Sequence, residues 1–186
     1  AELRALDVGY GYTADNGATF PLRGRGVGLM PTLREVLAAF PDERFLINFK
    51  SRDPAEADAL IAYLDATPNA DYARLAFYGA APADRVRELR PDLRTVSRQR
   101  LMNCAKSYVL TGWYGNVGAP CRNSIIFVPS NYGWVGWGWP NRFLDRMQRA
   151  GSEVYIVDAI HRGERPGLNG IDDAHALAAV PPGWRG

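Results

Sequence analysis

The strongest constraint on the fold of this chain is the regular alternation of strand-like and helix-like segments from residue 44 onward. Short apolar runs with β-forming residues predict strands at residues 44–51, 74–79, 94–97, 124–128 and 153–160. Apolar residues at helical spacing predict helices at residues 55–66, 82–89, 100–110, 140–150 and 172–179. Strands that alternate with helices predict a parallel sheet of βαβ units. Periodicity alone does not choose between an open sheet and a (β/α)₈ barrel.

The N-terminal part of the chain follows a different pattern. Residues 1–7 resemble a helix end, and residues 8–28 form a glycine-rich loop. A clear helix is predicted over residues 31–40, where Thr32 is a candidate N-cap and Glu35 stands at the spacing of a capping box. The length favours a single domain, so residues 1–186 are predicted to fold as one unit.

The composition excludes several classes of protein. The chain has 22 Lys and Arg against 20 Asp and Glu, which gives a net charge of +2. It therefore lacks the large excess of basic residues that is typical of proteins that bind nucleic acid. No apolar run approaches the roughly 18–20 residues of a transmembrane helix. Only two of the basic residues are lysines, Lys50 and Lys106. In this background, a lysine at a place where a charge is costly is a candidate functional residue. Oligomeric state is not indicated.

The two cysteines, Cys104 and Cys121, leave two interpretations open. They either form one disulfide that closes a loop or remain two buried thiols, because they match neither a metal-ligand spacing nor a CxxC redox pair. A disulfide would favour a periplasmic or secreted location over the reducing cytosol.

The sharpest local feature is the sequence LINFKS in the first predicted strand. Because side chains alternate along a strand, Asn48 and Lys50 share one face while Ile47 and Phe49 share the other. In a barrel the apolar face would pack on helices, which leaves Asn48 and Lys50 inside, near the mouth where such enzymes place catalytic groups. The competing interpretation is a lysine at a strand end that reaches solvent or pairs with a structural carboxylate.

A second feature is the segment PSNYGWVGWGWPN at residues 129–141. Aromatic side chains in a glycine-rich loop can stack on sugars or insert into a membrane interface. Packing of this loop over the barrel or its helices is the favoured interpretation.

Other polar side chains at predicted strand ends are either ligand contacts or ordinary loop caps. They are Ser97, Gln99, Ser130, Asn131 and Asp158. His175 falls in a predicted helix and is expected to be exposed. His161 is expected to be a loop residue, because no nucleophile accompanies it.

Three stretches together resemble the glycerophosphodiester phosphodiesterase family. They are Leu6-Asp7-Val8-Gly9, Pro31-Thr32-Leu33-Arg34-Glu35-Val36-Leu37 and Asn48-Phe49-Lys50. The later segments SIIFVPSNYGWVGWGWPNRFLDRM and AGSEVYIVDA look like a bacterial branch of the same family.

The resemblance implies a TIM (β/α)₈ barrel of the phosphatidylinositol-phospholipase-like phosphodiesterase superfamily. It also implies hydrolysis of a small glycerophosphodiester to glycerol 3-phosphate and an alcohol, with two histidines and a calcium or magnesium ion. Lys50 takes the role of the phosphate-facing catalytic lysine. Asn48 stands at the family's metal-ligand position. The candidate substrate-binding residues are Asn48 together with Asn131 and Asp158, which are chosen for their places at predicted strand ends.

The chain departs from the family pattern at two places, and these departures change what is expected of its metal site and its activity. Asn48 stands where the family has a glutamate, which removes a charge from the metal site. The family's early catalytic histidines have no counterpart here, and the HRG at His161 follows the wrong strand. The chain is therefore expected to hold about strands three to seven of an incomplete barrel, and to be inactive alone. A catalytically silent barrel that binds lipid or glycan is the main alternative, and a phospholipase-like enzyme is a third.

Overall fold

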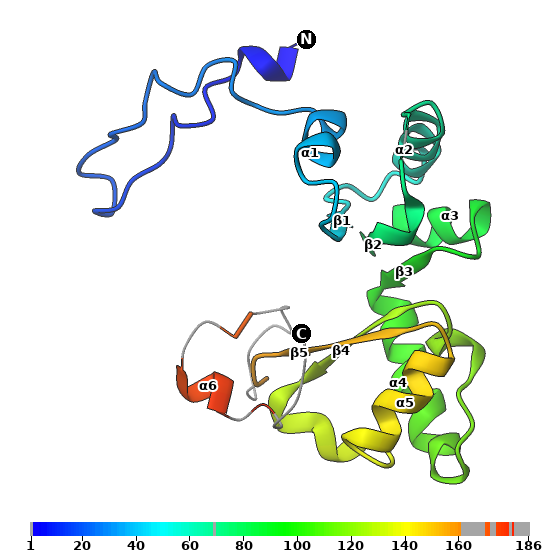
Figure 1. Ribbon diagram of the computed structural model, residues 1–186. Helices are drawn as coiled ribbons and strands as arrows, with labels where there is room; N and C mark the ends of the chain where they lie inside the picture. The colour runs from blue at the N-terminus through cyan, green and yellow to red at the C-terminus, as the bar shows by residue number, and fades with distance from the viewer. Residues whose placement is uncertain (1, 69, 161–169, 172–173, 179, 181–186) are drawn as a thin grey trace. The chain divides into compact units, whose positions relative to one another are not determined.

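The computed structural model describes residues 2–68, 70–160, 170–171, 174–178 and 180. The chain divides into two compact units, Ala1–Glu43 and Arg44–Gly186. Each unit is described by itself, and the elements are labelled as in Figure 1. No described helix has the length and apolar character needed to cross a membrane.

The first unit is a long loop between a short 3-10 turn, η1 (Glu2–Ala5), and helix α1 (Leu33–Ala39). The Asp7 carboxylate holds the loop together. It accepts backbone hydrogen bonds from Gly24 at 2.6 Å, Gly26 at 2.9 Å and Gly9 at 3.0 Å. These bonds, that from Gly24 above all, lower the pKa of Asp7. A Cβ at Gly26 would lie 2.5 Å from the Asp7 carboxylate, so the close approach requires glycine there.

Helix α1 begins at the predicted capping box, which is confirmed. The Thr32 hydroxyl accepts from the Glu35 backbone N–H at 3.3 Å, and the Glu35 carboxylate accepts from the Thr32 N–H at 2.7 Å. Arg4 forms an ion pair with the same carboxylate. These contacts stabilise the charged form of Glu35 and lower its pKa to about 2 from an ordinary value of 4.5, with the Thr32 N–H as the largest cause.

This geometry predicts how α1 responds to acid. Because the pKa is depressed in the folded state, the stabilisation by Glu35 is fully present above pH 4.5 and is lost as the pH falls toward about 2. A carboxyl-carbon NMR titration should place the Glu35 midpoint near 2 in the folded protein. A midpoint near 4.5 would show that the capping box does not form in solution.

The second unit contains the predicted strands, and every paired strand is parallel to its neighbour. Strands β1, β2 and β3 form one sheet in sequence order, and β4 and β5 form a second. Their bounds are Phe45–Asn48 (β1), Leu75–Gly79 (β2), Arg94–Ser97 (β3), Ile125–Pro129 (β4) and Glu153–Val157 (β5). The fold is therefore mixed α/β with short parallel sheets, as the alternation predicted, and no closed barrel is formed by the described residues.

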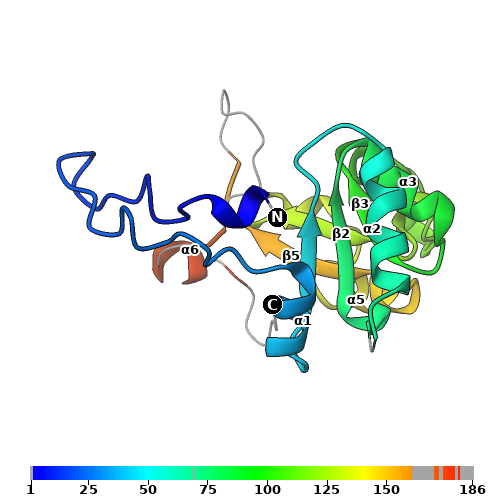
Figure 2. The same cartoon turned by 90° about the horizontal axis from the view of Figure 1, so that it is seen from above.

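Helices follow the strands as the sequence predicted. Their bounds are Ala55–Asp65 (α2), Ala81–Leu89 (α3), Arg98–Thr111 (α4), Asn141–Arg149 (α5) and Ala174–Ala178 (α6). Short 3-10 turns are Tyr72–Arg74 (η2), Gly112–Tyr114 (η3), Ala119–Cys121 (η4) and Ser130–Val135 (η5). Helices α2 and α3 lie side by side along the first sheet (Figure 2). The first and last strands are shorter than predicted and end at Asn48 and Val157.

Apolar side chains form separate clusters on the two faces of the sheets, and helices cover one of these faces. Phe49 and Phe77 stack with ring centroids 6.4 Å apart, and Phe77 is fully buried. On β4 and β5, Ile126, Val128 and Val154 pack with Cys104 of α4 and with α5. The opposite face carries a second cluster, formed by Ala76, Val96 and Ile125 with Tyr78, Leu101, Phe127 and Tyr155.

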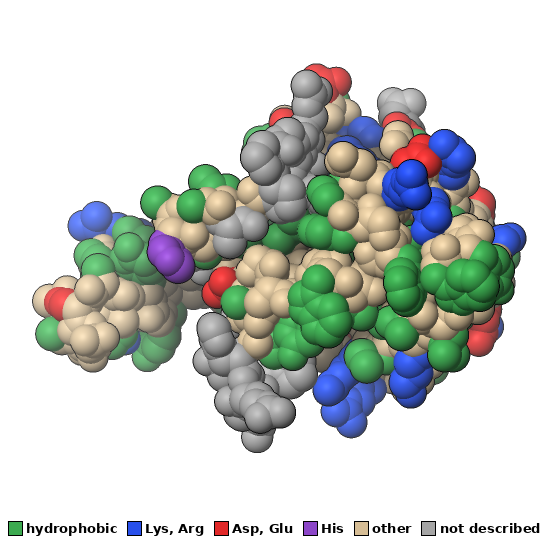
Figure 3. All heavy atoms as spheres, turned by 90° about the horizontal axis from the view of Figure 1, so that it is seen from below, with side chains coloured by type: hydrophobic (Ala, Val, Ile, Leu, Met, Phe, Trp, Pro, Cys, Tyr) green, Lys and Arg blue, Asp and Glu red, His purple; other side chains and the backbone are tan. Residues whose placement is uncertain are grey.

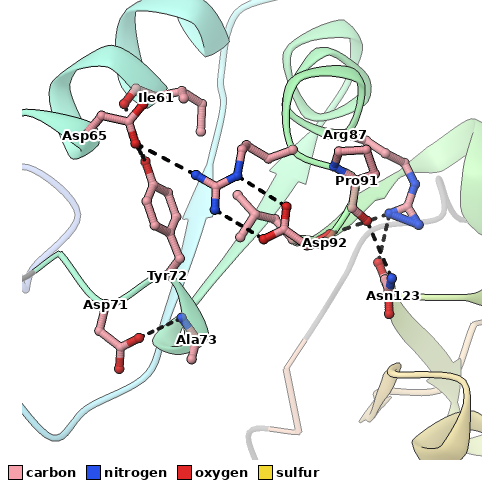
Figure 4. A network of polar contacts seen from close by, with 11 residues as sticks. Ile61, Asp65, Asp71, Tyr72, Ala73, Arg87, Pro91, Asp92 and Asn123 are labelled. Carbon is pink, nitrogen blue, oxygen red and sulfur yellow. Dashed lines mark hydrogen bonds and ion pairs between the residues drawn. The ribbon is translucent and has the colours of Figure 1, made fainter.

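Side-chain contacts join the two sheets between β3 and β4. The Ser124 hydroxyl donates to the Thr95 carbonyl at 3.0 Å, and the Thr95 N–H donates to the Asn123 carbonyl at 3.4 Å. Arg87 of α3 donates to the same Asn123 carbonyl at 3.0 Å (Figure 4). The strands therefore continue in sequence order from β3 to β4.

Figure 4 also shows how the chain is fixed just before β2. The Tyr72 hydroxyl donates to the Asp65 carboxylate at the end of α2, at 2.6 Å. Burial and then Asp65 raise the pKa of Tyr72 to about 12. This contact holds the end of α2 against the start of β2.

An ion-pair network connects the first strand to the last. Glu153 at the start of β5 pairs with Arg94 of β3 and with Arg44, which precedes β1. The Tyr155 hydroxyl donates to the same carboxylate at 3.0 Å. Burial, followed by the charge of Arg44, lowers the pKa of Arg94. Five strands laid flat would span about 19 Å, more than these side chains can bridge, so the strands must curve toward each other on this face.

Candidate active site

The candidate site lies at the carboxyl ends of the strands, on the face opposite to the helices. Asn48 ends β1 and stands in register with Tyr78 of β2. Lys50 continues the same face two residues later, and both Asn48 and Lys50 are exposed. The Phe49 N–H donates to the Tyr78 carbonyl at 2.8 Å, which extends the strand pairing by one residue and fixes the backbone between Asn48 and Lys50. This arrangement agrees with the prediction that Asn48 and Lys50 lie on the same face of the strand.

Lys50 has no hydrogen bond or ion pair with the described part of the chain. Of the two forms of the competing interpretation, pairing with a structural carboxylate gains no support from the described residues, whereas a lysine that reaches solvent agrees with the exposure of Lys50. Its ammonium group carries three donors and a compact charge that suits a phosphate oxygen.

A row of aromatic side chains crosses the same face next to Asn48. Tyr78 meets Phe127 edge to face at 6.0 Å, and Phe127 lies 6.1 Å from Tyr155. The row supplies an apolar wall beside the polar strand ends. These residues were not predicted to belong to a site, although an aromatic residue occurs in each of three predicted strands, in FYG, FVP and VYI.

The structure gives Asn131 a bracing contact. Its side-chain amide donates to the Ile160 carbonyl at 2.9 Å and accepts from the Ile160 N–H at 3.1 Å. The pair ties the turn after β4 to the segment after β5. This use of both amide groups leaves Asn131 less able to bind substrate than its position at a strand end suggested.

Asp158 follows directly after β5 and is half-buried. Its carboxylate accepts from the Ala159 N–H at 2.7 Å. Asn131 and Asp158 thus lie near one another through the Ile160 contact, at the carboxyl ends of β4 and β5. No hydrogen bond or ion pair connects either of them to Asn48 or Lys50 within the described residues.

The remaining polar candidates act locally. Ser97 is buried, caps α4 through the Arg100 N–H at 3.2 Å and donates to Asp84 at 2.8 Å. Gln99 donates to Asn103 at 3.0 Å within α4. His175 is exposed on α6, as expected. His161 lies outside the described residues.

The described residues do not fit a divalent cation. No group of three or more His, Cys, Asp or Glu side chains lies close enough together, in the part of the chain that the structure describes, to hold a metal ion. At the strand ends, the candidate binding groups are the neutral amides of Asn48 and Asn131 and the Asp158 carboxylate, and Lys50 brings a positive charge close to Asn48.

The tryptophan loop after β4 packs against helices with part of its surface, as favoured from the sequence. Trp139 packs on Phe143 with ring centroids 5.6 Å apart, and the Trp137 indole N–H donates to the Val109 carbonyl of α4 at 2.8 Å. Trp134 is 79% exposed, however, so packing does not account for the whole loop.

Comparison with known proteins adds no assignment. No family model, no curated protein and no solved structure matches this chain.

Proposed function

We propose that the second unit is part of a (β/α)₈ barrel and that the protein is a glycerophosphodiester phosphodiesterase-like hydrolase. The observation that carries the proposal is Lys50, an exposed lysine two residues beyond the end of β1 that has no ion pair with any residue the structure describes. Parallel strands in sequence order, with α2 and α3 along one face, support the barrel. The curvature required by the Arg44–Glu153 ion pair supports it as well.

In this proposal, water adds to the phosphorus of a glycerophosphodiester and a P–O bond breaks, which yields glycerol 3-phosphate and an alcohol. Lys50 binds a non-bridging phosphate oxygen and stabilises the negative charge of the transition state. Asn48 hydrogen-bonds the phosphate or the glycerol hydroxyls through its exposed side-chain amide. The row of Tyr78, Phe127 and Tyr155 limits access of water on one side.

The test uses the natural protein that carries these residues, purified from its source, with glycerophosphocholine as substrate. We expect release of glycerol 3-phosphate, and Lys50→Met should lower kcat/KM by about 100-fold or more. Lys50 is exposed, so this variant should fold normally. Arg25→Met, which removes an exposed cation from the other unit, is the matched control and should retain activity.

Residues 1–186 expressed alone are expected to show no turnover with calcium or magnesium present. Metal-dependent turnover by that segment would refute the expectation that further strands are needed. A natural protein that binds the diester without cleaving it would instead support the silent binding barrel.

A further inference from the structure

An exposed aromatic surface lies at the C-terminal end of α4, away from the side chains of the candidate site. Leu110, Trp113 and Tyr114 are 72%, 66% and 58% exposed. Val109 is also exposed. The half-exposed Trp137 lies beside it, because its indole N–H donates to the Val109 carbonyl. We call Val109, Leu110, Trp113, Tyr114 and Trp137 the aromatic surface. Figure 3 views the molecule from below and shows hydrophobic side chains gathered on the surface, with Lys and Arg side chains beside them.

The aromatic surface rests on a well-braced base. The buried Tyr108 donates its hydroxyl to the Trp137 carbonyl at 2.9 Å, and Arg146 donates to the Tyr108 oxygen at 3.0 Å and to the Gly112 carbonyl at 2.7 Å. A Cβ at Gly112 would lie 2.8 Å from the Tyr108 ring, so only glycine allows this close approach. The exposed rings are therefore presented by a fixed scaffold.

The surrounding segment carries only positive charge. Residues 93–144 contain no Asp or Glu and six basic residues, although the whole chain is nearly balanced. Lys106 is exposed and lies one helical turn before Leu110, so the two share a face of α4. Arg142 is also exposed and follows the tryptophan loop. The next acidic residue, Asp145, is already paired with Arg149 at 2.8 Å.

An open cavity of about 600 Å³ begins directly after Tyr114. Three arginines contribute to its lining, Arg122, Arg146 and Arg149, and no acidic side chain does among the described residues. Arg149 is already paired with Asp145, so the positive charge of the cavity comes from Arg122 and Arg146. A Cβ at Gly115 would lie 3.4 Å from the Arg146 guanidinium, which shows that the turn carrying Trp113 and Tyr114 adjoins the cavity. Guanidinium groups match the geometry of phosphate oxygens.

We propose that the aromatic surface and the arginine cavity dock the protein onto a bilayer that contains anionic phospholipid. Trp and Tyr side chains prefer the interface between headgroups and acyl chains, and Leu110 adds apolar area beside them. Each Lys or Arg near an anionic membrane strengthens the attraction by roughly fivefold. The cavity accepts the phosphate of one headgroup. This docking does not depend on the hydrolase proposed above.

The test is flotation of the protein with vesicles of phosphatidylcholine mixed with phosphatidylglycerol, and with vesicles of phosphatidylcholine alone. We expect binding to the mixed vesicles, loss of that binding at high salt, and little binding to phosphatidylcholine alone. Trp113→Ala should weaken binding about tenfold or more, since burial of one large side chain is worth at least about 1.5 kcal/mol.

Two matched pairs separate docking from general surface effects. Tyr114→Ala should weaken binding, whereas Tyr12→Ala, with a similar exposure of 54% in the other unit, should not. Lys106→Glu should weaken binding more than Arg25→Glu does. An unchanged circular dichroism spectrum shows that each variant is folded.

Three results would overturn the proposal. The first is equal binding to both vesicle types, and the second is equal loss in Tyr12→Ala and Tyr114→Ala. The third is absence of binding to the mixed vesicles. In that case, self-association that Trp113→Ala abolishes would assign the surface to a second copy of the chain, and uptake of inorganic phosphate would assign the cavity to a free anion.

Discussion

Replacement of Phe77 by alanine is expected to lower the free energy of unfolding of the second unit by about 3–5 kcal/mol. Phe77 lies in the central strand of the first sheet, is fully buried and stacks on Phe49. Truncation removes the buried ring and leaves a cavity that the flanking strands, held by parallel pairing on both sides, cannot close.

Urea denaturation followed by circular dichroism measures this effect. Because domains of this kind are stable by about 5–15 kcal/mol, the midpoint should move by a large fraction of its value. Phe40→Ala is the control, since Phe40 is 53% exposed and its truncation should cost less than about 1 kcal/mol. Equal effects of the two substitutions would show that Phe77 is not in a packed core.

Loss of the disulfide is expected to destabilise the second unit by about 3 kcal/mol. Cys104 of α4 and Cys121 of η4 form this bond, which closes a loop of 17 residues, so the structure selects one of the two interpretations left open by the sequence. Both cysteines belong to the buried cluster with Tyr108, Phe143 and Met147. The bond therefore restrains the α4–β4 connection at the base of the aromatic surface.

The double substitution Cys104→Ala, Cys121→Ala tests the disulfide. It should lower the denaturation midpoint by the same amount as a reducing agent does, and the reducing agent should then have no further effect. A thiol titration of the natural chain, under denaturing conditions without reductant, should find no free thiol from these two residues. Detection of both as free thiols would contradict the pairing.

The local sequence predicted most of the fold. The positions of the strands could be predicted from apolar runs, because neighbouring residues decide which face of a short strand is buried. The Thr32–Glu35 capping box could be predicted because it depends on residues only three positions apart. The first and last strands were predicted too long, because pairing with a neighbouring strand decides where a strand ends. Lys50 was also found from the sequence, through the alternation of side chains along LINFKS.

Long-range contacts could not be predicted. The side-chain amide of Asn131 hydrogen-bonds the backbone of Ile160, which is 29 residues away, and this contact was not predicted. The curvature of the strands depends on the ion pair between Arg44 and Glu153, which are 109 residues apart in the sequence. No local sequence pattern predicts such a pair. The arginine cavity likewise gathers residues from the segments before and after η4, from α5 and from the turn that follows α5, which come together only after packing.

The scarcity of lysine has a practical consequence. Lys50 and Lys106 are both exposed, one at the strand ends and the other on the α4 face that bears Leu110. Lys106→Arg leaves a single side-chain amine at the candidate active site, and Lys50→Arg leaves a single one beside the aromatic surface. Amine-reactive reagents can therefore be directed to either side chain without introduced cysteines, which would disturb the disulfide. Acylation of Lys50 removes the charge that the proposed hydrolysis needs, whereas a fluorophore on Lys106 reports the environment of the aromatic surface.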